Sequence, residues 1–177
     1  IVGAMANNFL AYKKYEIGKS LKEENINEVV KKILEEAEVN KCKILIPEDC
    51  LVSKSFEGMA VSKDVKFVEK NDIILDVGPK TIKVIEKIID NSNTIMWNGP
   101  AGYFESKNFA LGTNAIAQRI SENTKNRSLI SVLGGGDTVS AINKSGLELS
   151  FTHLSTAGGA FLEYLEGKDL PGLSVLK

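Results

Sequence analysis

The chain has 177 residues, 43% of them hydrophobic and 25% charged, a composition typical of one globular domain, or of one domain and a small remainder. Its formal net charge of −1 comes from 22 basic and 23 acidic residues, so it offers no basic field for nucleic acid, and no apolar run reaches the length of a membrane span. Cys42 and Cys50 have no neighbouring histidine and fit neither a zinc site nor a disulfide framework, so we expect reduced thiols and a cytoplasmic protein.

The first half of the chain predicts two helices and a series of short strands. Residues 1–2 read as the tail of a strand, which indicates that the chain begins inside a larger fold. Residues 4–15 have helical composition, and Ser20 with Glu23 forms a capping box in front of an apolar stripe with helical spacing over 21–37. Short apolar runs then predict a buried strand at 43–47 and two weaker strands, off the main sheet, at 50–53 and 65–68.

The second half predicts a regular alternation of helices and strands. Pro79 fits the first turn of a helix that ends near position 89, because a helix does not use the N–H of that first position. Strands that alternate with helices imply a mostly parallel sheet with helices on both faces, so the predicted fold class is α/β, with a three-layer, Rossmann-like arrangement. The remaining predicted elements are strands at 94–97, 129–133 and 151–154, helices at 104–123, 137–145 and 157–165, and a loose tail at 171–177.

The most informative segment is the run of three glycines at 134–136, which follows a predicted strand and precedes Asp137 and Thr138. Three glycines cost backbone entropy, so the fold must need a positive φ or a close approach of the backbone. A strand that leads through a glycine turn into a helix is a common way to hold phosphate on backbone N–H groups, and Asp137 supplies an oxygen ligand for magnesium. Taken alone, the segment fits equally well a ligand-free turn in which Asp137 caps the helix.

Three further glycine-containing turns follow predicted strands, at 3–5, 98–102 and 157–159. Ligands of open α/β sheets bind at the carboxyl ends of the strands. Four such turns on one edge of the sheet predict a single phosphate-bearing ligand that lies across that edge. The turn at 157–159 also has a simpler explanation, because close packing of a helix on a sheet favours small residues as well.

Several other motifs carry less weight. Residues 18–20 resemble the end of a P-loop, but position 13 is Lys where that motif needs Gly, and no strand precedes it. A dinucleotide-binding fingerprint fails because position 139 is Val, which leaves an NAD-dependent enzyme as a weak alternative. His153, the single histidine, is expected to be a hydrogen-bonded structural residue. Glu105 either stabilises a helix N-terminus or binds ribose hydroxyls, and the residues alone favour the first role.

With these segments in this order, the chain resembles the C-terminal nucleotide-binding domain of phosphoglycerate kinase from end to end. The family's N-terminal domain, which binds the phosphoglycerate, and the strand–helix segment that opens the C-terminal domain have no counterpart in residues 1–177. The segments that carry the resemblance are IVGAMA at 1–6, IGKS at 17–20, IPED at 46–49, LDVGPKT at 75–81, WNGPAGYFE at 97–105, GGGDT at 134–138, HLSTAGGA at 153–160 and LEGKDLPG at 165–172.

The resemblance implies reversible, Mg²⁺-dependent phosphoryl transfer between ATP and 3-phosphoglycerate in glycolysis, with this chain as the ATP/ADP-binding part of a full-length monomer and inactive alone. Phosphoryl transfer needs positioning and charge stabilisation, which backbone donors at helix N-termini can supply. By resemblance, the adenine is bordered by Gly3, Ala4 and Leu75, the nucleotide is lined by Asn98, Pro100 and Gly102, and the ribose is held by Glu105. The resemblance also implies that Asp137 binds the metal and that Thr138 contacts a phosphate. The transferring phosphoryl group would face Gly135, Gly136, Gly158 and Gly159.

Three residues depart from the family pattern. Ala4 and Ala157 each replace a glycine, and Tyr103 replaces a smaller apolar residue beside the nucleotide. A different class of function is a nucleotide-binding or interaction module without a catalytic role. The sequence upstream of Ile1 would distinguish the two hypotheses, because the enzyme requires a basic substrate domain there.

Overall fold

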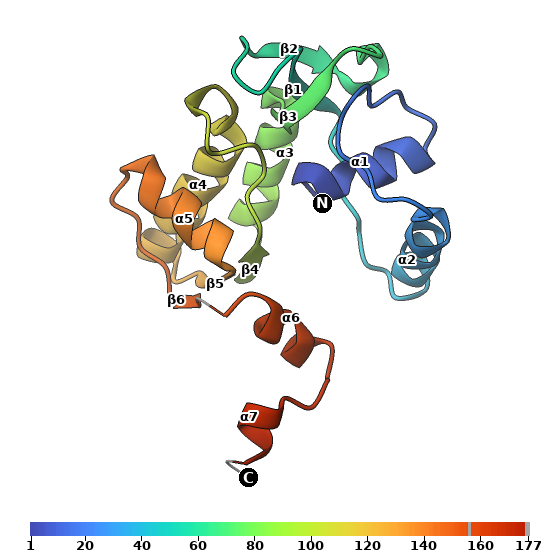
Figure 1. Ribbon diagram of the computed structural model, residues 1–177. Helices are drawn as coiled ribbons and strands as arrows, with labels where there is room; N and C mark the ends of the chain where they lie inside the picture. The colour runs from blue at the N-terminus through green and yellow to red at the C-terminus, as the bar shows by residue number, and fades with distance from the viewer. Residues whose placement is uncertain (156, 176–177) are drawn as a thin grey trace. The chain divides into compact units, whose positions relative to one another are not determined.

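The computed structural model describes residues 1–155 and 157–175 (Figure 1). No helix in these residues is long and apolar enough to cross a membrane. The chain divides into two compact units, and the boundary between them falls inside the helices α3 (Pro79–Asp90) and α4 (Leu111–Arg127). Unit 1 comprises Ile1–Glu86 and Pro100–Ile116, and unit 2 comprises Lys87–Gly99 and Ala117–Lys177.

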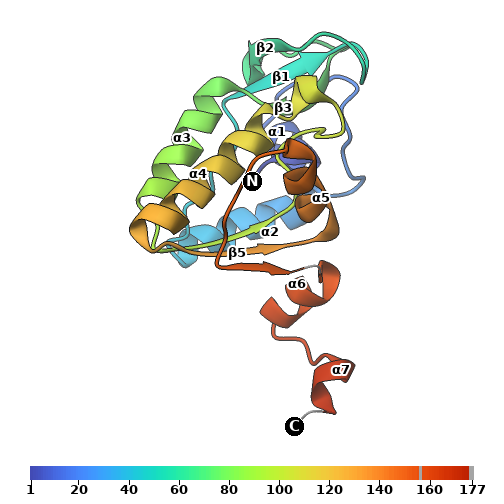
Figure 2. The ribbon, with the colours of Figure 1, turned by 90° about the vertical axis from the view of Figure 1, so that its left-hand side faces the viewer.

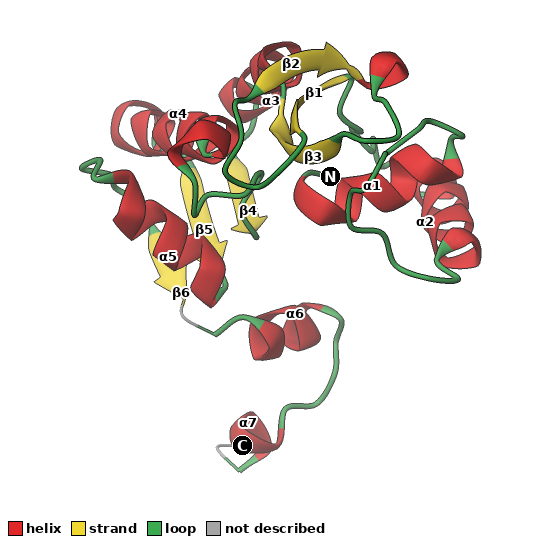
Figure 3. Ribbon diagram, turned by 45° about the horizontal axis from the view of Figure 1, so that its top comes forward, coloured by secondary structure: helices red, strands yellow, loops and turns green. Residues whose placement is uncertain are grey.

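Unit 1 is built around a three-stranded antiparallel sheet with the strand order β2-β1-β3 (Figure 3). All residues of the central strand are buried, and its Cys50 and Val52 join Leu10 of the first helix in an apolar core. Besides the first turns of α3 and α4, the unit contains α1 (Gly3–Tyr12), α2 (Asn27–Val39), β1 (Asp49–Ser53), β2 (Val61–Asp64), the 3-10 turn η1 (Val65–Phe67), β3 (Ile73–Val77) and the 3-10 turn η2 (Lys107–Phe109).

At one end of this sheet, a buried carboxylate accepts hydrogen bonds from two lysines. Asp72 is 1% exposed and accepts hydrogen bonds from the Nζ atoms of Lys54 and Lys63, each at 2.8 Å. Its backbone carbonyl accepts the N–H of Lys19 at 2.7 Å, and a Cβ at Gly18 would lie 2.2 Å from that same oxygen. Gly18 has φ +59, so the turn at 17–20 needs glycine for structural reasons.

Unit 2 contains a three-stranded parallel sheet with the strand order β4-β5-β6. The register pairs Asn98 with Gly134 and Gly134 with Ser155, so the carboxyl ends of all three strands meet at one edge. Besides the last turns of α3 and α4, the unit contains β4 (Thr94–Asn98), β5 (Ile130–Gly134), α5 (Gly136–Ser145), β6 (His153–Ser155), α6 (Gly159–Leu165) and α7 (Pro171–Ser174).

Helices lie on both faces of this parallel sheet. Ser131 and Gly134 are three positions apart on β5 and therefore point to opposite faces. The Ser131 hydroxyl lies 2.9 Å from that of Thr124 on α4, whereas a Cβ at Gly134 would lie 2.7 Å from the ring of Phe161 on α6. Figure 2 shows α4 and α6 on opposite sides of β5. The predicted α/β class, with a parallel sheet between helices, is confirmed.

Most predicted helices and strands of the second half are confirmed, with shifts at their ends. The helix predicted over 104–123 is an exception, because residues 107–109 form a separate 3-10 turn and α4 starts only at Leu111. The strand predicted at 50–53 is β1, and it lies off the parallel sheet, as expected. Of the tail at 171–177, residues 171–174 form α7, and positions 176 and 177 lie outside the described residues.

Three expectations for the first half are wrong, and one strand was missed. Residues 43–47, predicted to be a strand, pair with no strand; the carbonyl of Leu45 accepts a hydrogen bond from the amino group of Ile1 at 2.8 Å. An apolar run predicts a strand, but only pairing with a neighbour makes one. Residues 65–68 begin with the turn η1, since Asp64 caps it by accepting the N–H of Lys66. The strand β3 at 73–77 was not predicted.

The third wrong expectation is the capping box. The helix α2 starts at Asn27, and the Ser20 hydroxyl instead accepts the N–H of Ile74 at 2.8 Å and donates to the carbonyl of Ile17. The side chain that local pattern assigns to a helix cap is therefore used to join the turn at 17–20 to β3. The rejection of a P-loop at 18–20 agrees with this structural role.

Candidate functional site

The glycine turn of unit 2 adopts the backbone conformation that its sequence predicts. Gly135 has φ +97, and a Cβ there would lie 2.9 Å from Oδ1 of Asn98, so both a positive φ and a close approach require glycine. Gly135 is the N-cap of α5, and no side chain caps that helix. The alternative in which Asp137 caps the turn is therefore wrong: Asp137 is exposed in the first turn of α5 and leaves the helix N-terminus to other partners.

Thr138 connects this turn to the end of β4. Its side chain is fully buried, and its hydroxyl oxygen accepts the N–H of Gly99 at 2.8 Å. The carbonyl of Gly99 in turn accepts the indole N–H of Trp97 at 2.7 Å. The buried hydroxyl of Thr138 therefore holds the loop after β4 against the first turn of α5.

The second glycine turn of unit 2 lies against the first. Gly158 is the N-cap of α6, and a Cβ there would lie 3.4 Å from the Cα of Gly135. The N–H of Ala157 donates to the hydroxyl of Ser155 at 3.2 Å, and Gly159 begins the helix. The structure thus brings Gly135 and Gly158 together at the carboxyl edge of the parallel sheet.

The predicted residues of unit 1 gather around the loop at 100–105. Gly3 has φ +64, donates its N–H to the carbonyl of Ala101 at 3.1 Å, and a Cβ there would lie 3.0 Å from the carbonyl of Pro100. Leu75 accepts the N–H of Tyr103 at 2.6 Å. Gly3, Leu75, Pro100 and the backbone up to Tyr103 therefore form one connected region. The turn at 3–5, however, follows an extended segment and no strand of the parallel sheet, so the expectation of four turns on one sheet edge is confirmed for three of them only.

Two departures from the family pattern can be located in unit 1. Ala4 is exposed in the first turn of α1, a position that any small residue can adopt. The ring of Tyr103 makes an edge-to-face contact with Phe56, with centroids 5.1 Å apart, and packs against Leu75 and neighbouring apolar side chains. Tyr103 thus adds aromatic surface to the region that contains Leu75.

Glu105 is exposed in a turn, and α4 has no acidic residue in its first turn. The interpretation of Glu105 as a partner of the helix dipole is therefore wrong, because the helix starts six residues later, at Leu111. His153 is exposed on β6, and its expected role as a hydrogen-bonded structural residue stays a prediction. The side chain of Glu105 is left available for a ligand.

Two residues with a structural role in this region, Thr113 and Asp76, were not predicted from the sequence. The hydroxyl of Thr113, in the first turn of α4, accepts the N–H groups of Ala101 and Gly102 at 3.0 and 3.3 Å. Asp76, on β3, is 2% exposed, and burial raises its pKa to about 7 although the N–H groups of Gly112, Val77 and Leu111 bond to it. An aspartate inside the apolar run 73–77 was the available signal, since a buried charge needs partners.

The described residues do not supply a magnesium site formed by protein ligands alone. The residues that the structure describes contain no group of three or more His, Cys, Asp or Glu side chains that could hold a metal ion. A single exposed carboxylate such as Asp137 fits a different mode, in which Mg²⁺ keeps most of its waters and binds one carboxylate together with substrate phosphates. The donor set therefore suits a metal that arrives with a phosphate ligand.

A parallel α/β sheet with glycine turns at the carboxyl ends of its strands places this chain in the class of α/β proteins with a Rossmann-like arrangement, in which that edge is the usual place for a ligand. The sequence model of the phosphoglycerate kinase family matches residues 1–168. The chain belongs to the phosphoglycerate kinase family.

Individual relatives agree with this assignment. The phosphoglycerate kinase of Wolbachia pipientis wMel is 44% identical over 177 residues, which cover 99% of this chain and 44% of that protein. The enzyme of Agrobacterium fabrum is 45% identical with the same coverage. The structure of phosphoglycerate kinase from Coxiella burnetii matches 99% of this chain and 44% of that chain with a TM-score of 0.91 at 38% identity. The chain thus spans less than half the length of these relatives.

Proposed function

We propose that the chain is the ATP/ADP-binding part of a phosphoglycerate kinase, an enzyme that reversibly transfers a phosphoryl group between ATP and 3-phosphoglycerate with Mg²⁺. The observation that supports this most directly is the β5–α5 turn, where Gly135 takes a positive φ against Asn98 and no side chain caps the helix. Family membership supports the proposed reaction, and an uncapped helix N-terminus is a common place for a protein to bind phosphate.

The phosphates and metal are assigned to unit 2. The N–H groups of Gly135, Gly136, Gly158 and Gly159 would donate to the transferring phosphoryl group, where charge spreads over three oxygens in the transition state. Thr138 would donate its hydroxyl to a phosphate. Asp137 would hold Mg²⁺, which neutralises phosphate charge when bound. The contact between the Gly135 and Gly158 turns supports their action on one group.

The base and ribose are assigned mainly to unit 1. Gly3, Ala4 and Leu75 would border the adenine, and Pro100 and Gly102 would line the nucleotide with Asn98. Glu105 would accept hydrogen bonds from ribose hydroxyls, which its exposure in a turn permits. The hydrogen bonds that join Gly3 to Ala101 and Leu75 to Tyr103 support a common role for these residues.

The chain covers 44% of its relatives, so the 3-phosphoglycerate site would be supplied by the part of the enzyme that these residues do not include. We expect the 177-residue chain to bind nucleotide without turnover, because phosphoryl transfer needs both substrates enclosed and water excluded. The complete enzyme is proposed to act in the cytoplasm as a monomer. A binding module without catalysis, the alternative, would share the nucleotide site but lack a substrate domain in its complete form.

Calorimetric titration with Mg-ADP tests the proposal. The chain is expected to bind Mg-ADP, and Asp137→Asn is expected to weaken binding by about tenfold in the presence of Mg²⁺ and much less in EDTA, since a single charge-assisted contact is worth about 1.5–3 kcal/mol. Glu148→Gln, which removes an exposed negative charge shortly after the end of the same helix, is the matched charge control.

Binding of NADH in place of Mg-ADP would favour the dehydrogenase alternative and overturn the proposal. Substantial turnover of the 177-residue chain in a coupled kinase assay would contradict the assignment of the second substrate site to the rest of the enzyme.

A further inference from the structure

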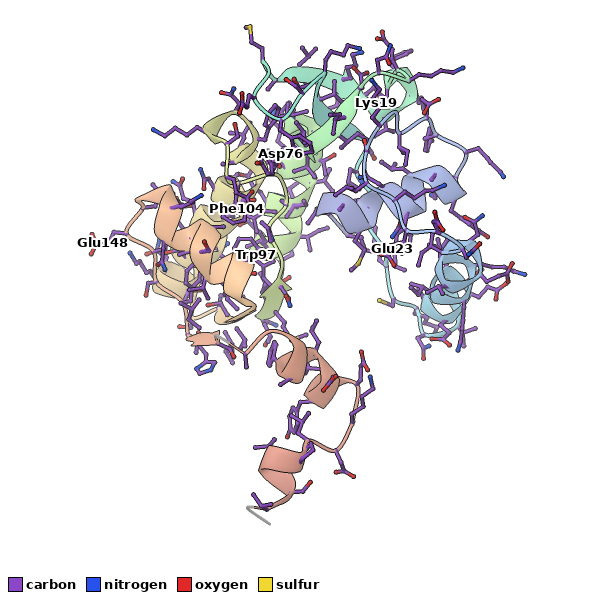
Figure 4. The ribbon with its side chains drawn as sticks, in the orientation of Figure 1. Lys19, Glu23, Asp76, Trp97, Phe104 and Glu148 are labelled. Carbon is purple, nitrogen blue, oxygen red and sulfur yellow. The ribbon has the colours of Figure 1, made fainter. Side chains whose placement is uncertain are left out.

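The carboxylate of Asp76 has no part in the roles assigned above, although Asp76 directly follows Leu75 on β3 (Figure 4). Its Oδ1 accepts the N–H of Val77 at 2.8 Å, and its Oδ2 accepts the N–H of Gly112 at 2.9 Å. Gly112 lies in the first turn of α4, so the carboxylate stands at the positive end of that helix. Asp76 therefore joins the end of β3 to the start of α4.

The backbone of the loop at 100–105 packs directly on the same carboxylate. A Cβ at Gly102 would lie 2.4 Å from Cγ and Oδ1 of Asp76, and a Cβ at Gly112 would lie 2.5 Å from Oδ1. No side chain other than hydrogen fits at either position without displacing the carboxylate, since real Cβ contacts are longer. Two glycines thus enclose Asp76, one from the loop and one from α4.

The remaining anchors of the loop are immediate neighbours of Asp76 and Gly112. Tyr103 donates its N–H to the carbonyl of Leu75, the residue before Asp76. Ala101 and Gly102 donate theirs to the hydroxyl of Thr113, the residue after Gly112. The loop is therefore hydrogen-bonded to the end of β3 on one side and to the first turn of α4 on the other. The bond between Asp76 and Gly112 fixes the distance between these two elements.

We propose that Asp76 is a positioning residue for nucleotide binding, which holds the loop at 100–105 in its binding conformation through Gly112 and through direct packing on Gly102. This inference rests on the proposed function, which places Leu75, Pro100 and Glu105 at the nucleotide. Asp76 itself touches no ligand in this account. Its action is to fix the backbone that does, which reduces the entropy lost when the ligand binds.

The neighbouring strand offers a matched control. Asp49, on β1, is also 2% exposed; its Oδ2 accepts the N–H of Lys80 at 2.9 Å and its Oδ1 that of Thr81 at 2.8 Å. A Cβ at Gly78 would lie 2.3 Å from the carboxyl carbon of Asp49. Asp49 thus holds the first turn of α3 as Asp76 holds that of α4, but α3 carries no residue assigned to the nucleotide.

The experiment compares Asp76→Asn with Asp49→Asn in the full chain. Asparagine keeps the size of the side chain but only one acceptor oxygen, so one backbone N–H in each site loses its partner. Both variants are expected to unfold at a lower urea concentration than the wild type. Only Asp76→Asn is expected to raise the Kd for Mg-ADP, by about tenfold, and to accelerate hydrogen exchange at the amides of Gly102 and Tyr103.

An unchanged Kd in Asp76→Asn, or an equal increase in both variants, would overturn the proposal. If the wild type does not bind Mg-ADP, the proposed function fails, and hydrogen exchange then decides the role of Asp76: faster exchange at 102–103 in Asp76→Asn alone supports it, and unchanged exchange contradicts it. If Asp76→Asn does not fold, Gly112→Ala, which displaces the same carboxylate while retaining it, is tested by the same two measurements against the wild type.

Discussion

At the scale of single residues, Asp72 and Asp76 show that hydrogen-bond partners decide whether the pKa of a buried carboxyl group ends above or below its ordinary value. Burial raises the pKa of Asp72, but hydrogen bonds from Lys54 and Lys63 outweigh it and lower the pKa to about 2. For Asp76 burial dominates over the backbone N–H groups, and the pKa rises to about 7. The stabilising effect of ionised Asp72 is therefore lost only in acid, as the pH falls from about 4 towards 2. The stabilising effect of protonated Asp76 is lost in the other direction, as the pH rises from about 4 towards 7.

The pH dependence of stability tests the Asp76 environment. Between its ordinary pKa of 3.8 and its raised value of about 7, folded Asp76 keeps a proton that the unfolded chain releases, so the free energy of unfolding decreases as the pH rises through this window. We expect the urea midpoint of the wild type to be lower at about pH 8 than at about pH 5, and this difference to be smaller in Asp76→Asn, which cannot titrate. The same pH dependence in both proteins would contradict the raised pKa.

At the scale of elements, the sequence predicts the second half better than the first. The strands β4 and β5 and the helices α3 and α5 follow from apolar runs and from local signals such as Pro79 and the glycine turn at 134–136. The first half is decided by distant partners. Ser20 binds the backbone 54 positions later instead of capping a helix, and residues 43–47 lack the strand neighbour that would make them a strand.

The residues of the candidate site also differ in whether local sequence predicts their role. The conformation of Gly135 could be predicted, because a local glycine run carries the signal. The roles of Asp76 and Thr113 could not, because Asp76 bonds to backbone 36 residues away in the sequence and Thr113 to backbone 11 and 12 residues away. Only the fold brings those groups together.

At the scale of elements, mutation can test whether the β5–α5 turn needs glycine at position 135. Gly135→Ala is expected to lower the free energy of unfolding by about 1–3 kcal/mol, because it forces a side chain into a positive φ, and the new Cβ meets Oδ1 of Asn98. Gly136→Ala, at a helical position with open space around its Cβ, is expected to leave stability unchanged or to raise it slightly. Urea unfolding of both variants measures the difference. A Gly135→Ala variant as stable as the wild type would show that the turn does not need glycine at 135.

At the scale of the whole molecule, the chain belongs to the phosphoglycerate kinase family and spans less than half the length of its relatives. The residues proposed for the phosphates lie in unit 2, and those proposed for the base and ribose lie mainly in unit 1. Backbone N–H groups and single polar side chains make up most of the proposed donors. Such a site suits phosphoryl transfer, in which the protein positions its substrates and stabilises charge.

The most direct test of this account is a ¹H–¹⁵N NMR titration of the chain with Mg-ADP. We predict that the largest shifts fall on the amides of the two glycine turns, at 135–138 and 158–159, and on Gly3 and the loop at 100–105. Shifts concentrated elsewhere on the chain, or none at saturating Mg-ADP, would contradict the proposal that these turns bind the nucleotide.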